Sequence, residues 1–273
     1  MKYPCSLAID PSTRYPKIAY CDGAPRVKDL KLASWDGTAW RIETVDSTGD
    51  VGPYASLALD PSTRFPRIAY YNATAGTLKL ASWDGTAWGI ETVDSTGNVG
   101  QYASLALDPS TGDPRIAYYD ATNKDLKYAA RNGSVWGFAT VDSGGDVGRY
   151  ASLALDPSTK NPRIAYYDFA NKGLKYEWYD GSSWHPEIAD GTPDRGMYAS
   201  LALDGSGIPH ISYYDNTLMR LMFADRHVGW QVGTIDFGPN VGKYTSLKID
   251  ASDQAHIAYY DAGAQDLKYA SQQ

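Results

Sequence analysis

The chain has 273 residues, 43% of them hydrophobic, and its 22 Tyr and 26 Gly against only four Glu favour strands and turns over helices. Its net charge of -7 argues against nucleic acid or an anionic membrane as the main partner, because like charges repel. No apolar run reaches the roughly 18 residues needed to cross a bilayer, and the first ten residues lack the basic and apolar regions of a signal peptide.

The first two predicted strands, residues 4–10 and 16–22, form a hairpin that carries both cysteines of the chain. If Cys5 lies opposite Cys21, their Cβ atoms come within reach of a disulfide, which would indicate an oxidising compartment. If the two are one register step apart, both are buried free thiols. The sequence leaves both interpretations open.

A unit of about 48 residues repeats along the chain. The motif SLALD and its variants place an Asp at positions 10, 60, 108, 156, 204 and 250. Each complete unit contains four runs of strand character, which in residues 54–94 are YASLALD, PRIAYYD, LKLASW and WGIETVD. The expected units are about 3–53, 54–101, 102–149, 150–197, 198–243 and 244–273, forming one domain over 1–273.

Short links join these runs and predict antiparallel hairpins. DPST places Asp and Pro at the first two positions of a turn, and WDGTAW supplies a tight turn with Gly. Successive residues of a strand point to opposite faces of the sheet, and in runs such as IAYY both sets are apolar. Both faces of each small sheet are therefore expected to be covered. Four short strands per unit and six units predict an all-β, six-bladed β-propeller of four-stranded antiparallel blades.

The sixth unit ends at LKYASQQ, before any run of the WGIETVD type. The last blade is therefore expected to lack its outer strand in this chain. We expect a three-stranded blade, a strand lent by a neighbouring molecule, or a longer parent chain. Oligomerisation through this blade is one consequence.

The running pattern SLALD…PRIAYYD…LKYAS…DGTAW…ETVDS resembles the tandem propeller repeats of secreted bacterial and archaeal proteins, over essentially the whole chain. This resemblance implies a secreted or cell-surface location, with the leader not present in this chain. The WDGTAW turn is also similar to the Asp-box of sialidase propellers, but here Gly directly follows Asp. In architecture the chain resembles the propeller lectins, although their usual Arg, Glu and Trp sugar-binding set is not evident.

One face of such a propeller collects acidic loops. Carboxylates clustered in Gly-rich loops suit a hard cation such as Ca²⁺. The segments DSTGD and DSGGD offer Asp46, Asp50, Asp142 and Asp146 as candidate ligands. The same Asp residues can instead form Asx turns that need no metal.

A Lys recurs in the LKY run of most units, at a position covered on both faces. It can form an ion pair with the Asp or Asn that ends the paired YYD strand. Alternatively, Tyr, Asp and Lys converge at each blade junction as a platform for a sugar, with an aromatic face and polar partners for hydroxyls. The candidate residues under this hypothesis are Tyr71, Asn72, Lys79, Tyr119, Asp120, Lys127, Tyr167, Asp168, Lys175, Tyr260, Asp261 and Lys268.

Two groups of Trp differ in their pattern. Trp residues open the fourth run in all five complete units, which indicates packing between blades. Trp35, Trp83 and Trp178 lie in or just before predicted turns and occur in only some units, so they are candidates for contact with a ligand, with surface packing as the alternative.

The segment 176–240 departs most from the repeat. It contains Glu177, His185, Glu187, Arg195, Arg226 and His227. A carboxylate and a His there can act as general acid and base on a polysaccharide bond, but drift of the repeat explains the same residues. His210 and His256 occupy the position that Lys or Arg fills in other units, and are predicted to be strand residues.

Three functions follow in order of preference. The first is a non-catalytic, multivalent ligand-binding propeller, expected to be carbohydrate-binding and lectin-like, whose repeated sites would gain from avidity. The alternative is a structural or protein–protein interaction scaffold. The third is a carbohydrate-active enzyme with its site in 176–240. The expected partner is a glycan or a protein surface, with no cofactor other than the hypothetical Ca²⁺.

Overall fold

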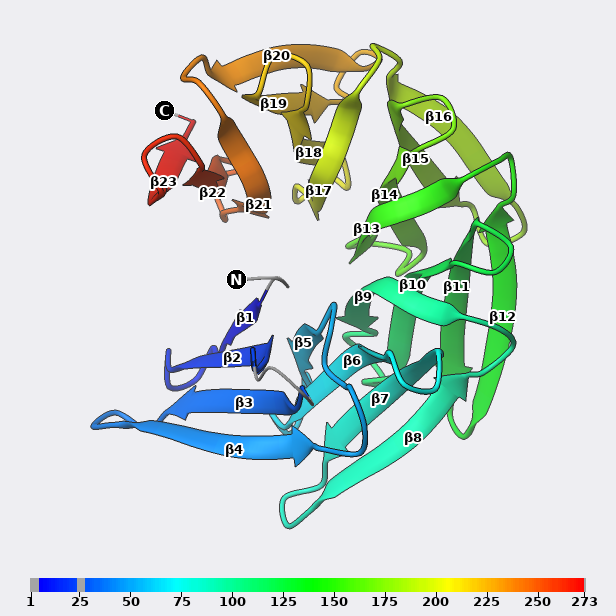
Figure 1. The fold of residues 1–273 in the computed structure, drawn as a ribbon, viewed down its shortest axis with the longest axis vertical. Helices are drawn as coiled ribbons and strands as arrows, with labels where there is room; N and C mark the ends of the chain where they lie inside the picture. Colours follow the sequence, from blue (N-terminus) through cyan, green and yellow to red (C-terminus); the bar gives the residue numbers. More distant parts are fainter. Residues whose placement is uncertain (1–4, 24–27, 273) are drawn as a thin grey trace. The chain divides into compact units, whose positions relative to one another are not determined.

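The structure, a computed structural model, describes residues 5–23 and 28–272 and confirms the all-β prediction. These residues form 23 strands and no helix, so no helix within the described ranges could span a membrane. The strands build five four-stranded antiparallel sheets and one three-stranded sheet, the blades of a six-bladed β-propeller (Figure 1). The blades group into two compact units, residues 1–140 and 141–273.

The first unit holds three blades, whose strands follow chain order across each sheet. Blade 1 consists of β1 (Ser6–Ile9), β2 (Pro16–Cys21), β3 (Leu30–Trp35) and β4 (Trp40–Asp46). Blade 2 consists of β5 (Ser56–Leu59), β6 (Pro66–Asn72), β7 (Thr77–Trp83) and β8 (Trp88–Asp94). Blade 3 consists of β9 (Val99–Leu107), β10 (Pro114–Asp120), β11 (Asp125–Asn132) and β12 (Val135–Asp142), and the unit boundary falls within β12.

The second unit holds the other blades. Blade 4 consists of β13 (Val147–Leu155), β14 (Pro162–Asp168), β15 (Gly173–Tyr179) and β16 (Trp184–Asp190). Blade 5 consists of β17 (Arg195–Leu203), β18 (Pro209–Asp215), β19 (Arg220–Asp225) and β20 (Gln231–Asp236). Blade 6 has only β21 (Val241–Ile249), β22 (Ala255–Asp261) and β23 (Asp266–Ser271), which confirms the prediction of a missing outer strand.

Asp side chains organise both types of predicted hairpin. In the DPST turn of blade 2, Asp60 Oδ1 accepts hydrogen bonds from the backbone N–H groups of Ser62 and Thr63, both at 3.0 Å. In the DG turn of the same blade, Asp84 Oδ1 accepts from Thr86 N at 2.7 Å and Ala87 N at 2.8 Å. These Asx contacts satisfy turn donors locally, which explains the regular recurrence of Asp.

Two small residues of the repeat join neighbouring blades. Ser56 Oγ of blade 2 accepts a hydrogen bond from Leu105 N of blade 3 at 2.9 Å, and Ser6, Ser152 and Ser200 make the same contact with the blades that follow them. Gly100 has a φ of +104°, and a Cβ there would lie 2.7 Å from the Leu78 Cα of the preceding blade. Only Gly permits this approach. The Gly of the VG motif and the Ser of the SLALD motif therefore recur because they make contacts between neighbouring blades.

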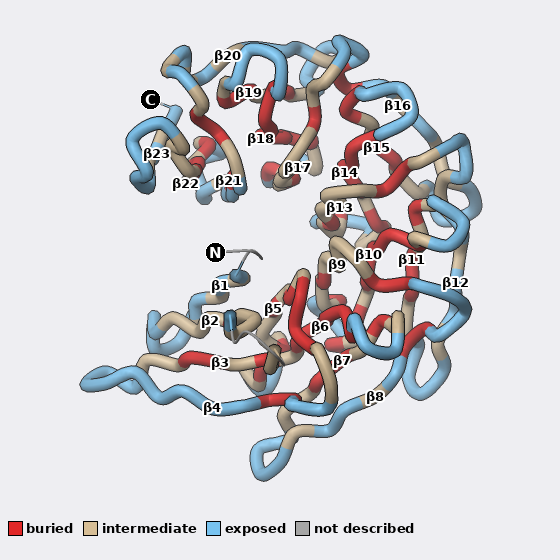
Figure 2. Tube along the Cα trace, in the orientation of Figure 1, coloured by how far each residue is buried: buried red, intermediate tan, exposed pale blue. Residues whose placement is uncertain are grey.

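The second and third strands carry most of the core, while the fourth strands face solvent (Figure 2). In β6, Ile68, Ala69 and Tyr70 are fully buried although they alternate between the two faces of the sheet. In contrast, most of β4 is exposed. The covered faces agree with the sequence prediction of blades packed on both sides.

The disulfide interpretation is wrong, because the hairpin register offsets the two cysteines. Ser6 pairs with Ala19, which places Cys5 one step away from Cys21 along β2. Both thiols are free, and Cys5 is exposed rather than buried. Burial raises the pKa of the Cys21 thiol to about 11, so this half-buried group stays protonated at neutral pH.

Candidate functional site

Each Lys of the LKY run in the central blades pairs with an Asp from the preceding blade. Asp94, which ends β8, accepts hydrogen bonds from Lys127 Nζ and Tyr118 OH of blade 3, both at 2.6 Å. Its other oxygen accepts from Thr96 N at 2.9 Å, as the Asx-turn interpretation predicted. The same arrangement joins Asp46 to Tyr70 and Lys79, Asp142 to Tyr166 and Lys175, and Asp236 to Tyr259 and Lys268.

These contacts fix the protonation of the cluster. Burial alone would raise the pKa of Asp94, but hydrogen bonds from Lys127, Thr96 and Tyr118 outweigh it and lower the pKa to about 2. Burial and the neighbouring Asp94 raise the pKa of Tyr118 far above its ordinary value. The cluster is therefore an ionised carboxylate held by a neutral phenol and an ammonium, which is a structural link between blades.

Blade 5 obtains the cation of this cluster from a different strand. Met222 replaces the Lys, and Asp190 instead forms an ion pair with Arg195 Nη1 at 3.3 Å, while Tyr213 OH donates to Asp190 at 2.7 Å. Arg195 occupies the first position of β17, where the other long first strands begin with Val. Arg195, in place of Val, thus supplies the positive charge that is lost where Met222 replaces Lys.

The predicted Tyr–Asp–Lys platform lies mainly inside the blades. Tyr71, Tyr119 and Tyr167 are buried, as are the adjacent Asn72, Asp120 and Asp168, whose side chains hold the loops between second and third strands. Lys79, Lys127 and Lys175 are paired as described above. In blade 6, Lys268 is more exposed and also lies 3.6 Å from Asp261, and Tyr260 is half-buried. The burial in blades 2–4 favours the structural role.

The four candidate Ca²⁺ ligands already have cationic partners. Asp46 and Asp142 pair with Lys79 and Lys175, and Asp50 pairs with Lys28 Nζ at 2.7 Å. Asp146 pairs with Arg149 at 2.8 Å. A cation at either loop would have to displace an ammonium or guanidinium group.

Trp83 forms the wall of two open pockets in the first unit. The larger, about 500 Å³, lies between blades 2 and 3 and is lined by Arg67, Glu91 and Arg131 beside Trp83, together with Asp60, Thr63, Phe65, Ser82, Asp84, Gly89 and Ile90. The Trp83 ring packs on Trp88 with centroids 5.5 Å apart. A rigid aromatic wall thus faces guanidinium and carboxylate groups.

A second pocket, about 400 Å³, lies between blades 1 and 2 and also uses Trp83. Glu43 and Lys17 take the places that Glu91 and Arg67 have in the larger pocket, because they occupy equivalent repeat positions. Of the other two Trp candidates, Trp35 packs on Trp40 with centroids 5.7 Å apart, and Trp178 stacks on His185 at 4.2 Å. Neither lines a pocket described here.

The structure assembles an Arg, Glu and Trp set that the sequence did not make evident. Glu91 of blade 2 accepts hydrogen bonds from Arg131 Nη1 at 3.0 Å and Trp136 Nε1 at 3.3 Å, both on blade 3. Glu187 of blade 4 is likewise bound by Arg226 and by Trp230 of blade 5, and Glu43 by Trp88. Three of the four Glu residues share one position of the fourth strand, and that regularity was the available clue.

In the divergent 176–240 segment, His185 stacks on Trp178, which donates a hydrogen bond to Glu187, and Glu187 pairs with Arg226. Glu177 is buried on β15, His185 pairs with Asp180 at 2.7 Å, and Arg195 bridges Asp190 and Asp215. Both oxygens of Glu187 are engaged, since Trp178 Nε1 also donates to it at 2.9 Å. His227 lies near His210, with ring centroids 5.6 Å apart.

No protein-family model and no curated protein sequence matches the chain. AofleA from Arthrobotrys oligospora is 14% identical, with a TM-score of 0.67 over 98% of this chain and 82% of that one. The SapL1 lectin, solved with α-methyl fucoside, is 14% identical, with a TM-score of 0.64 over 100% and 94% of the two chains. The α-L-arabinofuranosidase Arb93A from Fusarium graminearum, solved with an iminosugar inhibitor, is 11% identical, with a TM-score of 0.62 over 98% and 91%. At these identities the likeness shows the β-propeller fold alone.

Proposed function

We propose that the chain is a non-catalytic, multivalent carbohydrate-binding propeller whose sugar sites are the two pockets that share Trp83. One observation carries the proposal: a single rigid indole stands between two open pockets, each with a Glu and basic side chains. A sugar ring packs its C–H face on an aromatic side chain, while carboxylate and guanidinium groups hydrogen-bond its hydroxyls.

The polar groups of the larger pocket are held in place before any ligand arrives. Glu91 is fixed by Arg131 and Trp136, and its side chain remains 41% exposed. Arg67 is fixed by Asp60 at 2.7 Å and donates to the Gly112 carbonyl at 3.0 Å. Preorganised partners lower the entropic cost of binding a flexible, hydroxyl-rich ligand.

The carboxyl groups support binding over catalysis. A glycosidase typically needs a general acid whose pKa is raised. In the larger pocket, burial alone would raise the pKa of Asp60, but hydrogen bonds in its turn outweigh it and lower the pKa. Turn hydrogen bonds also lower the pKa of Asp84. The described carboxyl with a raised pKa is Glu177, which is buried away from solvent. The SapL1 lectin, solved with α-methyl fucoside, is among the fold matches, which accords with glycan binding.

A glycan array, probed with calcium and again with chelator, tests this function. Wild-type protein should bind selectively and equally in both buffers, because the pockets need no cation. Trp83→Ala should abolish binding, while Trp35→Ala, which removes the equivalent indole from blade 1, should leave it intact. A blank array in both buffers, or equal binding by the Trp83→Ala variant, would overturn the proposal in favour of a protein-interaction scaffold.

A further inference from the structure

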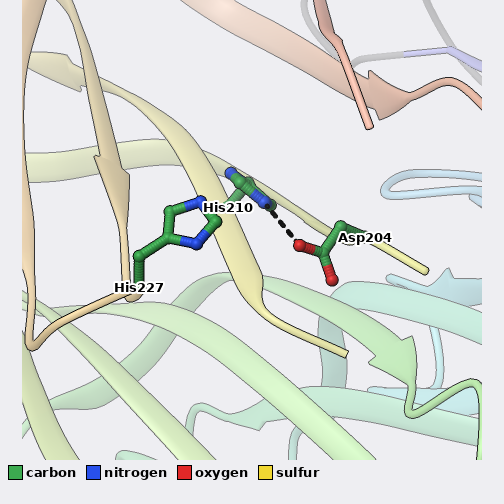
Figure 3. A group of neighbouring side chains, drawn as sticks. All are labelled: Asp204, His210 and His227. Carbon is green, nitrogen blue, oxygen red and sulfur yellow. Dashed lines mark ion pairs between the residues drawn. The ribbon is translucent and has the colours of Figure 1, made fainter. Parts of the chain in front are cut away.

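Blade 5 brings two His and one Asp together at the end of its sheet. Asp204 directly follows β17, His210 lies on β18, and His227 lies in the turn between β19 and β20. Figure 3 shows the His210 ring between the other two side chains. One ligand atom from each residue lies within 4.8 Å of the others, and this is the one such group of three found among the described residues.

His210 is the unusual member of this group. Its side chain is 6% exposed, yet neither ring nitrogen has a hydrogen-bond partner. Its Nε2 lies 3.5 Å from Asp204 Oδ2, too far for a good hydrogen bond. Buried ring nitrogens are normally satisfied, and one that is not needs an explanation such as an ion.

His256 shows what a satisfied His looks like at the same repeat position in blade 6. Its Nε2 lies 3.0 Å from Asp250, and its Nδ1 contacts the Tyr269 hydroxyl. In blades 2–4 the position holds Arg67, Arg115 and Arg163, each paired with the Asp of its own turn. The lack of partners is therefore specific to blade 5.

The position of His227 changes together with that of His210. In blades 1–4 the equivalent turn residue is Asp36, Asp84, Asn132 or Asp180. Blade 3 shows that these positions converge, because Arg115 contacts both Asp108 at 3.5 Å and Asn132 at 3.3 Å. Blade 5 has thus exchanged a guanidinium and a turn side chain for two imidazoles around an unchanged Asp.

We propose that Asp204, His210 and His227 bind a divalent transition-metal ion, with Zn²⁺ the best match. Two imidazoles and a carboxylate are typical Zn²⁺ ligands, and bonds of about 2.1 Å in a tetrahedron separate ligand atoms by roughly 3.4 Å, near the His210 to Asp204 distance. The ion would neutralise the carboxylate as the Arg does in other blades. Its fourth position stays open to water or a ligand.

The surroundings orient the site. Asp204 Oδ1 accepts backbone hydrogen bonds from Ser206 N at 2.9 Å and Ile208 N at 2.8 Å. These contacts orient the carboxylate so that Oδ2 faces His210. Such outer contacts fix a ligand carboxylate. His227 is exposed in a turn, so a small movement can bring its ring to the ion. This site is independent of the sugar pockets proposed above.

Zinc titration of tag-free protein in competition with a chromophoric chelator tests the proposal. We expect one site of micromolar affinity or tighter and a zinc-dependent rise in melting temperature. His227→Ala should weaken binding at least tenfold without unfolding the protein, because His227 is exposed.

Two control variants separate this site from other zinc ligands. His185→Ala removes a His whose side chain is 40% exposed and which pairs with Asp180, and Cys5→Ser removes the exposed thiol. Both should bind zinc as the wild type does. Absence of micromolar zinc binding, full binding by His227→Ala, or loss of binding in either control would overturn the assignment.

Discussion

At the scale of single residues, Glu177 is the clearest departure from the repeat. The equivalent positions of the other blades hold Ala33, Ala81, Ala129, Ala224 and Ala270. Tyr166 OH lies 3.3 Å from one Glu177 oxygen, and the other oxygen is buried without a partner. Burial, followed by repulsion from Asp142, raises the pKa of Glu177 to about 7. A carboxyl in an Ala position should make stability depend on pH.

Replacing Glu177 by Gln should stabilise the protein at high pH. The unfolded carboxyl ionises near pH 4.5, while the folded one keeps its proton to about pH 7. Wild-type stability therefore falls as pH rises between these values, by a total of about 3 kcal/mol, and Gln removes that loss. Urea unfolding at pH 4, 6 and 8 measures the difference.

The pH-dependent part of this difference is diagnostic, because a buried amide can add a constant offset. Glu177→Ala, which restores the residue of the other blades, should show the same pH dependence with a different offset. Parallel stability curves for wild type and both variants between pH 4 and 8 would show that Glu177 does not carry the shifted proton.

At the scale of strands, the Asp–Tyr–Lys clusters explain why the LKY and ETVD motifs recur together. Blade 5 supplies the cation from its first strand instead of its third, through Arg195 in place of a Val and Met222 in place of a Lys. The cluster therefore needs one cation near the Asp, and either strand can provide it. The same replacement of a third-strand cation by a first-strand cation should therefore work in another blade.

Lys127→Met should destabilise the protein by roughly 3 kcal/mol, because it leaves the buried Asp94 without a cation. Adding Val99→Arg, which copies Arg195 of blade 5 at the start of β9, should restore a large part of this loss. Val99→Arg alone, with Lys127 present, should be destabilising because it places a second cation in a covered site. Denaturant unfolding of the four proteins gives the coupling energy. Additive effects would contradict the exchange.

The sequence predicts contacts within blades better than contacts between them. Hairpins depend on local Asp, Gly and alternation, so the strands and Asx turns of DPST and DG segments were predictable. The Lys partner was not, because Asp94 lies 33 residues before Lys127 and meets it only through blade packing. The Arg131–Glu91–Trp136 contact was hidden for the same reason, and the cysteine register differed by one step.

At the scale of the whole molecule, duplication of the blade has kept the frame and varied the positions that meet at the ends of the sheets. The same three positions hold Asp60, Arg67 and Asp84 beside a pocket in blade 2, and Asp204, His210 and His227 in blade 5. Structural residues such as Gly100 recur because the blade junctions within each unit need them. Functional differences between blades are therefore to be sought at the variable positions.

Two sugar sites that share Trp83 make a prediction about the whole chain. Titration with a monovalent sugar should give two bound ligands per chain, falling to one in Glu91→Gln and in Glu43→Gln, because each Glu lines one pocket. Glu187→Gln should keep two, since Glu187 lines neither pocket. An unchanged stoichiometry in Glu91→Gln would remove the larger pocket from the proposal.

The two sites should also act together on a densely glycosylated surface. Losing one of them should reduce the apparent affinity for that surface tenfold or more, because rebinding through the second site is lost. An apparent affinity that falls only twofold would show that the two sites bind independently.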